Sequence, residues 1–131
     1  MTIFVDSSAI FAYLDRDDRY HSRARGALEV LVATDELLTS NYVVLESAVL
    51  VRGRLGSTLL RDLMEVVVPS MSVVWVDSQL HGSAVSAHLA SAQRKASLVD
   101  WVSFEVMRSR SLTRAFTFDR DFRAQGFEVV P

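Results

Sequence analysis

The chain has 131 residues, of which 50% are hydrophobic, and a formal net charge of −2 at pH 7. That length fits one domain spanning residues 1–131, and the charge argues against a generic nucleic-acid-binding surface. The absence of cysteine excludes disulfides, zinc–thiolate sites and thiol catalysis, and it fits a cytoplasmic protein. No apolar run approaches the ~18–20 residues of a membrane span, so the surplus apolar residues are expected at a subunit or partner interface.

Short apolar runs alternate with longer helical stretches along the whole chain. Strands are predicted at 2–6, 36–39, 72–76, 114–119 and 126–130, and helices at 7–14, 22–34, 41–53, 57–67, 80–93 and from Ser97 onward. Strands that alternate with helices indicate a mostly parallel central sheet of four to five strands with helices on both faces.

Four acids fall at related places on this scaffold. Asp6 and Asp119 end the first and fourth predicted strands, and Asp100 lies in the first turn of the helix after Ser97. Glu46 lies within an apolar helix, where a carboxylate without a partner would be costly to bury. Ligands bind at the carboxyl edge of parallel sheets, so these positions predict a shared site.

Each acid also has an ordinary structural explanation. Asp6 and Asp100 could cap helices, Asp119 could form a turn, and Glu46 could pair with an arginine. The convergence of all four on one edge favours the shared site. Four carboxylates there would repel each other unless a cation neutralised them, and oxygen ligands suit Mg²⁺ or Mn²⁺. Such ions activate water for phosphodiester hydrolysis.

Three segments carry a family resemblance: "IFVDSSAIFAYLD", "TSNYVVLESAVLVRGRLG" and "SLVDWVSFEVMRSRSLTRAFTFDRDF". Together they resemble the PIN-domain nucleases, and most of all the VapC-type toxins of bacterial toxin–antitoxin pairs. The resemblance runs from Asp6 to about Phe127, the segment from Ser97 to Phe122 being the most specific. It implies a PIN-like three-layer sandwich that works as a metal-dependent ribonuclease and homodimer. It also implies a cognate VapB-type antitoxin.

By the same resemblance, the acidic metal site consists of Asp6, Glu46, Asp100 and Asp119. Ser8 and Thr117 would support it. Five arginines follow in sequence and are expected to form a phosphate-binding rim beside Asp100 and Asp119, although a solvated face would explain them equally well. These arginines are Arg108, Arg110, Arg114, Arg120 and Arg123.

Two nearby residues are given ordinary structural roles. Asp121 fits a solvated turn better than a metal ligand, and Trp75 fits the core better than a base-stacking surface.

The substrate predicted from the resemblance and from a narrow acidic cleft is a single-stranded loop of structured RNA, with tRNA or rRNA favoured over bulk mRNA. Two other functions compete with this one. A phospho-acceptor domain would need a lysine near the phosphate, and the only lysine, Lys95, precedes Asp100 on the wrong side. A non-catalytic PIN-fold binding module would be favoured by the loss of an acid, and all four acids are present.

Overall fold

A five-stranded, all-parallel sheet forms the centre of the computed structural model, which describes residues 1–91 and 95–131. The strand order is β3-β2-β1-β4-β5. The chain therefore moves outward from β1 through β2 to β3, and then crosses to β4 on the other side of β1. The strands are β1 (Thr2–Val5), β2 (Glu36–Ser40), β3 (Ser72–Val74), β4 (Arg114–Phe116) and β5 (Glu128–Val130).

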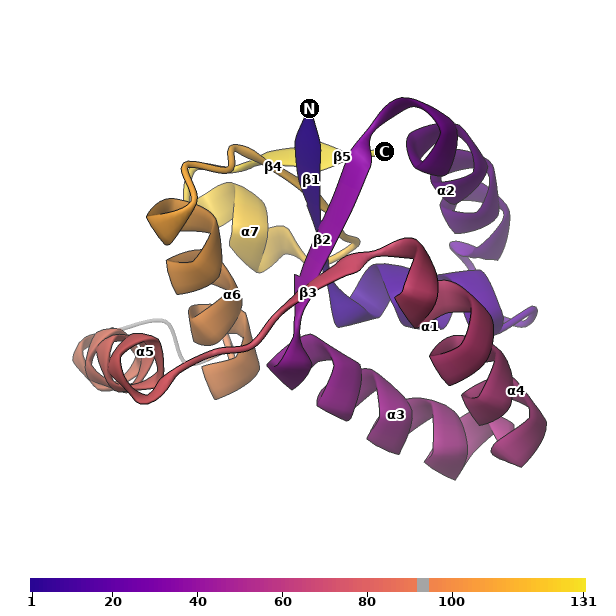
Figure 1. The fold of residues 1–131 in the computed structure, drawn as a ribbon, viewed down its shortest axis with the longest axis horizontal. Helices are drawn as coiled ribbons and strands as arrows, with labels where there is room; N and C mark the ends of the chain where they lie inside the picture. The colour runs from indigo at the N-terminus through magenta and orange to yellow at the C-terminus, as the bar shows by residue number, and fades with distance from the viewer. Residues whose placement is uncertain (92–94) are drawn as a thin grey trace.

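Helices cover the sheet on both sides (Figure 1), as the sequence predicted. Helices α5, α6 and α7 lie on one side, and α1, α2 and α4 lie on the other, while α3 leaves the carboxyl end of β2. Their bounds are α1 (Ser7–Leu14), α2 (His21–Thr34), α3 (Asn41–Leu55), α4 (Ser57–Asp62), α5 (Ser78–Ala90), α6 (Leu98–Ser109) and α7 (Arg120–Ala124).

The core is built on β1, the central strand. Ile3, Phe4 and Val5 are almost completely buried, as expected for a β-branched and aromatic run covered on both faces. The Phe4 ring stacks against Phe122 of α7 at 6.3 Å, and the Phe104 ring of α6 meets Phe122 edge-on at 5.0 Å. These ring contacts fix α6 and α7 against the sheet, and so fix the acids at their amino ends.

The structure departs from the predicted elements in several places. The predicted helix 57–67 is α4 followed by a π-helical turn, Leu63–Val67, and a 3-10 turn, Val68–Ser70. Pro69 lacks the N–H that a continuing α-helix needs. The predicted strand 114–119 ends at Phe116, because Asp119 instead caps α7, a helix too short to be predicted. The predicted helix 80–93 begins earlier, at Ser78, and its predicted end lies partly outside the described residues.

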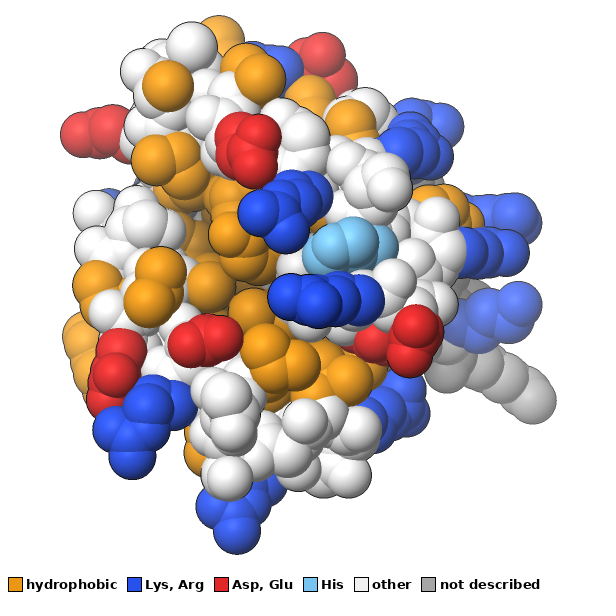
Figure 2. Space-filling view, turned by 90° about the vertical axis from the view of Figure 1, so that its right-hand side faces the viewer, with side chains coloured by type: hydrophobic (Ala, Val, Ile, Leu, Met, Phe, Trp, Pro, Cys, Tyr) orange, Lys and Arg blue, Asp and Glu red, His pale blue; other side chains and the backbone are white. Residues whose placement is uncertain are grey.

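Several large apolar side chains are exposed. Trp75, predicted to lie in the core, is 78% exposed, because β3 ends at Val74. Figure 2 shows apolar side chains interspersed with charged ones on the side of the molecule where α2 and α4 lie. Within residues 1–91 and 95–131, no helix combines the length and the hydropathy that a membrane span would require. The exposed apolar residues include Val30, Val32, Leu45, Val49, Met64, Val66, Trp75 and Leu89.

Candidate active site

Asp6 lies directly after the central strand, at the point where the strand order reverses between β1 and β4. Such a reversal leaves a crevice at the carboxyl edge of the sheet. The Asp6 side chain is buried, and the residue is only 2% exposed. The Asp6 backbone N–H donates to the Phe116 carbonyl at 3.0 Å. Asp6 thus caps α1, as the ordinary explanation required, and also lies at the ligand-binding edge.

The two oxygens of Asp6 have different surroundings. Oδ2 accepts hydrogen bonds from the Ser8 hydroxyl at 2.7 Å, the Thr117 hydroxyl at 2.8 Å and the Ser8 backbone N–H at 3.3 Å. Oδ1 is buried and has no hydrogen-bond partner among the described residues. A buried carboxylate oxygen without a donor is costly, which leaves it free to bind a cation.

Ser8 and Thr117 connect the exits of β1 and β4. Their hydroxyl oxygens lie 3.0 Å apart, so both reach the same oxygen of Asp6. The Ser8 hydroxyl also accepts from the Phe118 N–H at 3.0 Å, and the Thr117 hydroxyl accepts from the Asp119 N–H at 2.9 Å. Two hydroxyls therefore hold the Asp6 carboxylate and the loop that carries Asp119 in a fixed relation.

Asp100 reaches the same place from the first turn of α6. Ser97 and Asp100 form a reciprocal capping box, in which the Ser97 N–H donates to Asp100 at 2.9 Å and the Asp100 N–H donates to the Ser97 hydroxyl at 3.2 Å. Asp100 is 8% exposed. Burial, together with the charges of Asp6 and Asp119, raises the pKa of Asp100 to about 7.

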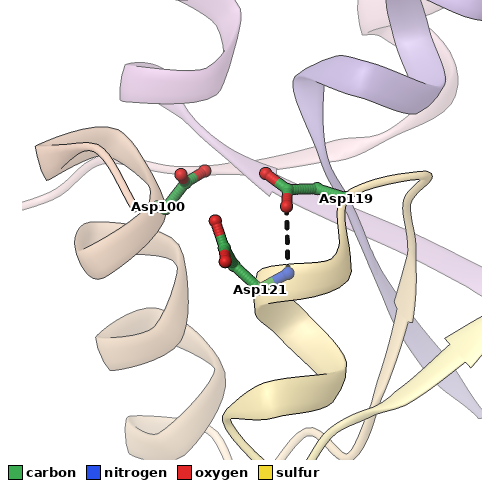
Figure 3. Close-up of side chains that lie close together, drawn as sticks. All are labelled: Asp100, Asp119 and Asp121. Carbon is green, nitrogen blue, oxygen red and sulfur yellow. Dashed lines mark hydrogen bonds between the residues drawn. The ribbon is translucent and has the colours of Figure 1, made fainter. Parts of the chain in front are cut away.

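Asp121 joins Asp100 and Asp119 in one group of carboxylates. Carboxylate oxygens of the three residues lie within 4.8 Å of one another. Figure 3 shows Asp100 pointing from α6 toward Asp119 and Asp121, which lie at the start of α7. The Asp121 N–H donates to Asp119 Oδ1 at 2.9 Å, so Asp119 caps α7. Asp121 lies in the first turn of α7 and not in the expected turn, with its carboxylate near those of Asp100 and Asp119, and its part in metal binding stays a prediction.

Three carboxylates of the site have raised pKa values. Burial is the main cause that raises the pKa of Asp6, of Asp100 and of Asp121, and the nearby Asp119 charge adds to it in each case. Hydrogen bonds from Ser8 and Thr117 oppose the rise at Asp6, and Lys95 opposes it at Asp121. Clustered carboxylates with a free buried oxygen are a donor set that fits a divalent cation bound by oxygen.

The raised pKa values predict how the stability of the metal-free protein depends on pH. Asp100 takes up a proton at about pH 7 in the folded state and near its ordinary value of 3.8 when unfolded. Between those values the folded state binds more protons, so stability should increase as pH falls from about 7 toward 4. We expect thermal melting in EDTA to show a higher Tm at pH 5.5 than at pH 7.5, relative to Asp100→Asn, which lacks this proton uptake.

Glu46 lies beside this group but not within it. The Ser7 hydroxyl donates to its carboxylate, and Ser7 is the residue next to Asp6. Within the described part of the chain Glu46 forms no ion pair with an arginine, contrary to the ordinary explanation for an acid in that helix. Glu46 therefore points to the carboxyl edge, and its part in metal binding stays a prediction.

The five arginines of the predicted rim do not lie together. Arg120 and Arg123 line a hollow that Asp119 also lines. Arg108 instead donates to Gln125 at 2.8 Å and lies over the Phe127 ring.

The other two arginines lie at the opposite edge of the sheet. Arg110 lines a hollow with Thr2 and Glu36, at the amino ends of β1 and β2, and Arg114 lies 3.7 Å from Glu128. The placement of Arg108, Arg110 and Arg114 beside the acids is therefore wrong. Helix α6 carries the chain ~15 Å between Asp100 and Arg110.

Sequence reasoning missed three other residues that lie around the acids. Tyr20 and Arg23 line the hollow with Asp119, and Arg54 lines an adjoining one. Tyr20 lies in the break before α2, Arg23 lies in the first turn of α2, and Arg54 lies in the last turn of α3. No sequence spacing relates these positions to Asp119, because it is the tertiary packing of α2 and α3 that brings them near.

The comparisons with known proteins match this architecture over nearly the whole chain. The family model described as PIN domain matches residues 3–128. A protein of Mycobacterium tuberculosis, named 23S rRNA-specific endonuclease VapC20, is 32% identical over 98% of both chains. The crystal structure of M. tuberculosis VapC20, described as a sarcin–ricin-loop-cleaving toxin, superposes with a TM-score of 0.86 over 98% of this chain and 99% of that one.

Two more distant structures share the fold alone. VapBC2 of Rickettsia felis, bound to a DNA fragment from its promoter, has a TM-score of 0.73 at 9% identity, covering 98% of this chain and 97% of that one. FitAcB of Neisseria gonorrhoeae has a TM-score of 0.72 at 17% identity, covering 100% of this chain and 97% of that one. The full-length family match and the 32% identity together show that this chain belongs to the PIN-domain family.

Proposed function

We propose that this protein is a metal-dependent endoribonuclease that acts as the toxin of a toxin–antitoxin pair. The observation that carries the proposal is the group formed by Asp100, Asp119 and Asp121, next to buried Asp6 with its unpartnered oxygen. The group offers carboxylates in place of a serine or cysteine nucleophile, so a water molecule must attack the phosphodiester. Full-length similarity to an rRNA endonuclease supports the same reaction class.

Asp6, Asp100, Asp119 and Asp121 would hold Mg²⁺ or Mn²⁺, with Glu46 acting from the side of Ser7. When bound, such an ion lowers the pKa of water and stabilises negative charge on the phosphoryl oxygens. Ser8 and Thr117 keep the Asp6 carboxylate oriented through three hydrogen bonds to Oδ2. The capping box with Ser97 does the same for Asp100.

The substrate proposed is a single-stranded loop of structured RNA. Arg120 and Arg123, which line a hollow with Asp119, would bind its phosphates, whereas Arg108, Arg110 and Arg114 do not line either of the hollows that Asp119 lines. A single strand can bring its backbone to acids in a hollow, while a duplex is too wide. The name of the M. tuberculosis relative favours rRNA over tRNA, and an rRNA target would place the activity in the cytoplasm.

Purified protein provides the test of this function. Wild type should cleave ribosomal RNA or tRNA at a single-stranded loop, EDTA should abolish cleavage, and Mg²⁺ or Mn²⁺ should restore it. Expression alone should arrest growth, and co-expression of the antitoxin encoded beside it should restore growth. Sequencing RNA 5′ ends after brief induction would identify the target. Intact RNA with either ion present, together with harmless expression, would favour a non-catalytic binding module instead.

The partners proposed are a VapB-type antitoxin and a second copy of this chain. Leu45 and Val49 are four residues apart on α3, and they are 67% and 66% exposed. Leu45 also lines an apolar hollow together with Met64 and Trp75. An apolar helix face of this kind is typical of a subunit interface. Val30 and Val32 are also exposed, on α2, but residues two positions apart in a helix point to different faces.

The homodimer leads to a prediction about α3. A glutamate in place of Leu45 would have to be desolvated in the interface, so Leu45→Glu should weaken dimerisation at least about tenfold. Sedimentation velocity at micromolar concentration measures this. Leu89→Glu is the matched control, because Leu89 is 79% exposed on α5, outside the proposed interface. A wild-type monomer, or equal effects of the two variants, would contradict this interface.

A further inference from the structure

Two hollows flank Asp119, and they share a wall. The first has a volume of about 490 Å³ and is lined by Arg23, Arg120 and Arg123. The second, of about 610 Å³, contains Ser8 and Asp121 and so opens onto the carboxylates. Tyr20, Phe118, Asp119 and Arg120 line both. Each volume falls in the range of small-molecule sites, so the first hollow can hold a nucleotide-sized group.

The shared wall is a pair of stacked aromatic rings. The ring centroids of Tyr20 and Phe118 lie 4.6 Å apart, and the ring planes differ by only 6°. The Tyr20 N–H donates to Asp18 at 2.8 Å, and Arg19 donates to the Tyr20 hydroxyl at 2.6 Å. The Phe118 N–H donates to Ser8, whose hydroxyl also donates to Asp6. Arg19 also lies over the Tyr20 ring, 4.6 Å from its centroid. The pair is therefore a fixed aromatic wall, tied by hydrogen bonds to the candidate metal site.

The first hollow is also rich in unpaired positive charge. Arg23 lies 5.7 Å from the Phe118 ring and 6.0 Å from the Tyr20 ring. Among residues 1–91 and 95–131, no carboxylate lies within ion-pairing distance of Arg23, Arg120 or Arg123. Asp119 is the one acidic side chain among the described residues that line this hollow, whose lining also includes Pro131. Three arginines that line a hollow with only one acidic side chain attract an anion, and their guanidinium groups can hold a phosphate by paired hydrogen bonds.

We propose that the first hollow binds the nucleotide next to the cleaved phosphodiester, with its base against the Tyr20–Phe118 pair and its phosphate held by Arg23 and Arg123. This inference rests on the proposed ribonuclease function and names the part of the site that selects an unpaired nucleotide. Stacking on aromatic rings requires a base that has left its helix, so the hollow admits loops and excludes duplexes. Asp119 and Arg120, which line both hollows, connect this nucleotide to the carboxylates.

The test measures binding in EDTA, so it does not depend on cleavage. The probes are a fluorescently labelled short oligoadenylate and an abasic ribose–phosphate oligomer of equal length, measured by fluorescence anisotropy. Tyr20→Leu should weaken oligoadenylate binding by about 5- to 150-fold, the range of base–aromatic stacking, and leave binding of the abasic oligomer unchanged. Tyr20→Phe keeps the ring and should bind like wild type.

Arg23→Gln should have a different signature. It removes a phosphate contact, so it should weaken both oligomers by the same factor and reduce the slope of log affinity against log salt by about 0.7. Arg25→Gln is the matched control, because Arg25 lies two residues along α2, on another face, and pairs with Glu29 at 3.4 Å. It should leave binding of both oligomers unchanged. Thermal melts of each variant show whether it is folded.

The outcomes separate this inference from the proposed function. If wild type cleaves RNA but Tyr20→Leu binds and cleaves like wild type, the nucleotide hollow is wrong and the ribonuclease function stands. If wild type cleaves no RNA, the proposed function fails on that result alone. The preference for oligoadenylate over the abasic oligomer then still tests whether the hollow binds a base. If Tyr20→Leu and Arg23→Gln weaken only the binding of the antitoxin, the hollow is a protein-docking surface and the inference is overturned.

Discussion

Replacing Asp6 with asparagine should abolish RNA cleavage and leave the protein folded. Loss of a group that only orients a metal ligand typically costs 10–100-fold, so loss of the buried ligand itself should exceed about 100-fold. The fold should survive because an asparagine oxygen can accept the hydrogen bonds from Ser8 and Thr117 that Asp6 Oδ2 accepts. The amide nitrogen would then take the position of Oδ1, which has no partner among the described residues.

The thermal stability of Asp6→Asn should equal or exceed that of wild type in EDTA. Burial raises the pKa of Asp6, which means that its charged form is destabilised in the folded state at neutral pH. The neutral amide removes that penalty. Calorimetry in EDTA and in Mg²⁺ measures the effect, and the Mg²⁺-dependent rise in Tm should be lost. Asp17→Asn, at an exposed position in the turn before α2, is the matched control and should cleave RNA normally. An Asp6→Asn protein that cleaves RNA at the wild-type rate would refute the metal site.

The acids of the site could be predicted to different extents, for identifiable physical reasons. The positions of Asp6 and Asp100 follow from local structure that the sequence shows directly. Asp6 follows the end of a buried strand, and Asp100 lies three residues after Ser97 at the start of a helix. The parallel sheet then brings their element ends to one edge. Asp119 also lies at that edge although β4 is shorter than predicted, because the loop after Phe116 carries it there.

Arg120 and Arg123 lie beside Asp119 as predicted, but the positions of Asp121 and of the other arginines could not be predicted. They depend on a helix too short to show a periodic pattern and on the packing of long helices. Asp121 faces Asp100 only because the five residues of α7 form a helical turn, and so short a helix has no periodic signal. The arginines were expected near the acids because they are near in sequence. Helix α6 carries Arg110 to the far edge of the sheet, and Arg23 reaches Asp119 only through packing of α2.

Asp121→Asn should shift the metal dependence of cleavage. Its carboxylate lies within 4.8 Å of those of Asp100 and Asp119, so it contributes to the charge that binds the ion. Being less buried than Asp6, it should bind directly or through water, and its loss should raise the Mg²⁺ concentration for half-maximal cleavage by about 10–100-fold. Cleavage at saturating Mg²⁺ should largely recover, in contrast to Asp6→Asn, which no Mg²⁺ concentration should rescue.

The pH dependence gives the same experiment a second readout. Asp100 must lose its proton to bind the ion, and its pKa is about 7. At subsaturating Mg²⁺, the cleavage rate should therefore fall by about tenfold for each pH unit below 7. Raising the Mg²⁺ concentration should move this fall in rate to lower pH. In Asp121→Asn the Mg²⁺ requirement should rise, while the pH of half-maximal cleavage should stay near that of wild type, because burial and the charges of Asp6 and Asp119 raise the pKa of Asp100. Asp77→Asn, which removes an exposed acid that caps α5, controls for charge loss at a helix start. If Asp121→Asn matches this control at every pH and Mg²⁺ concentration, Asp121 is a solvated turn residue after all, and the ion is held by Asp6, Asp100 and Asp119 without it.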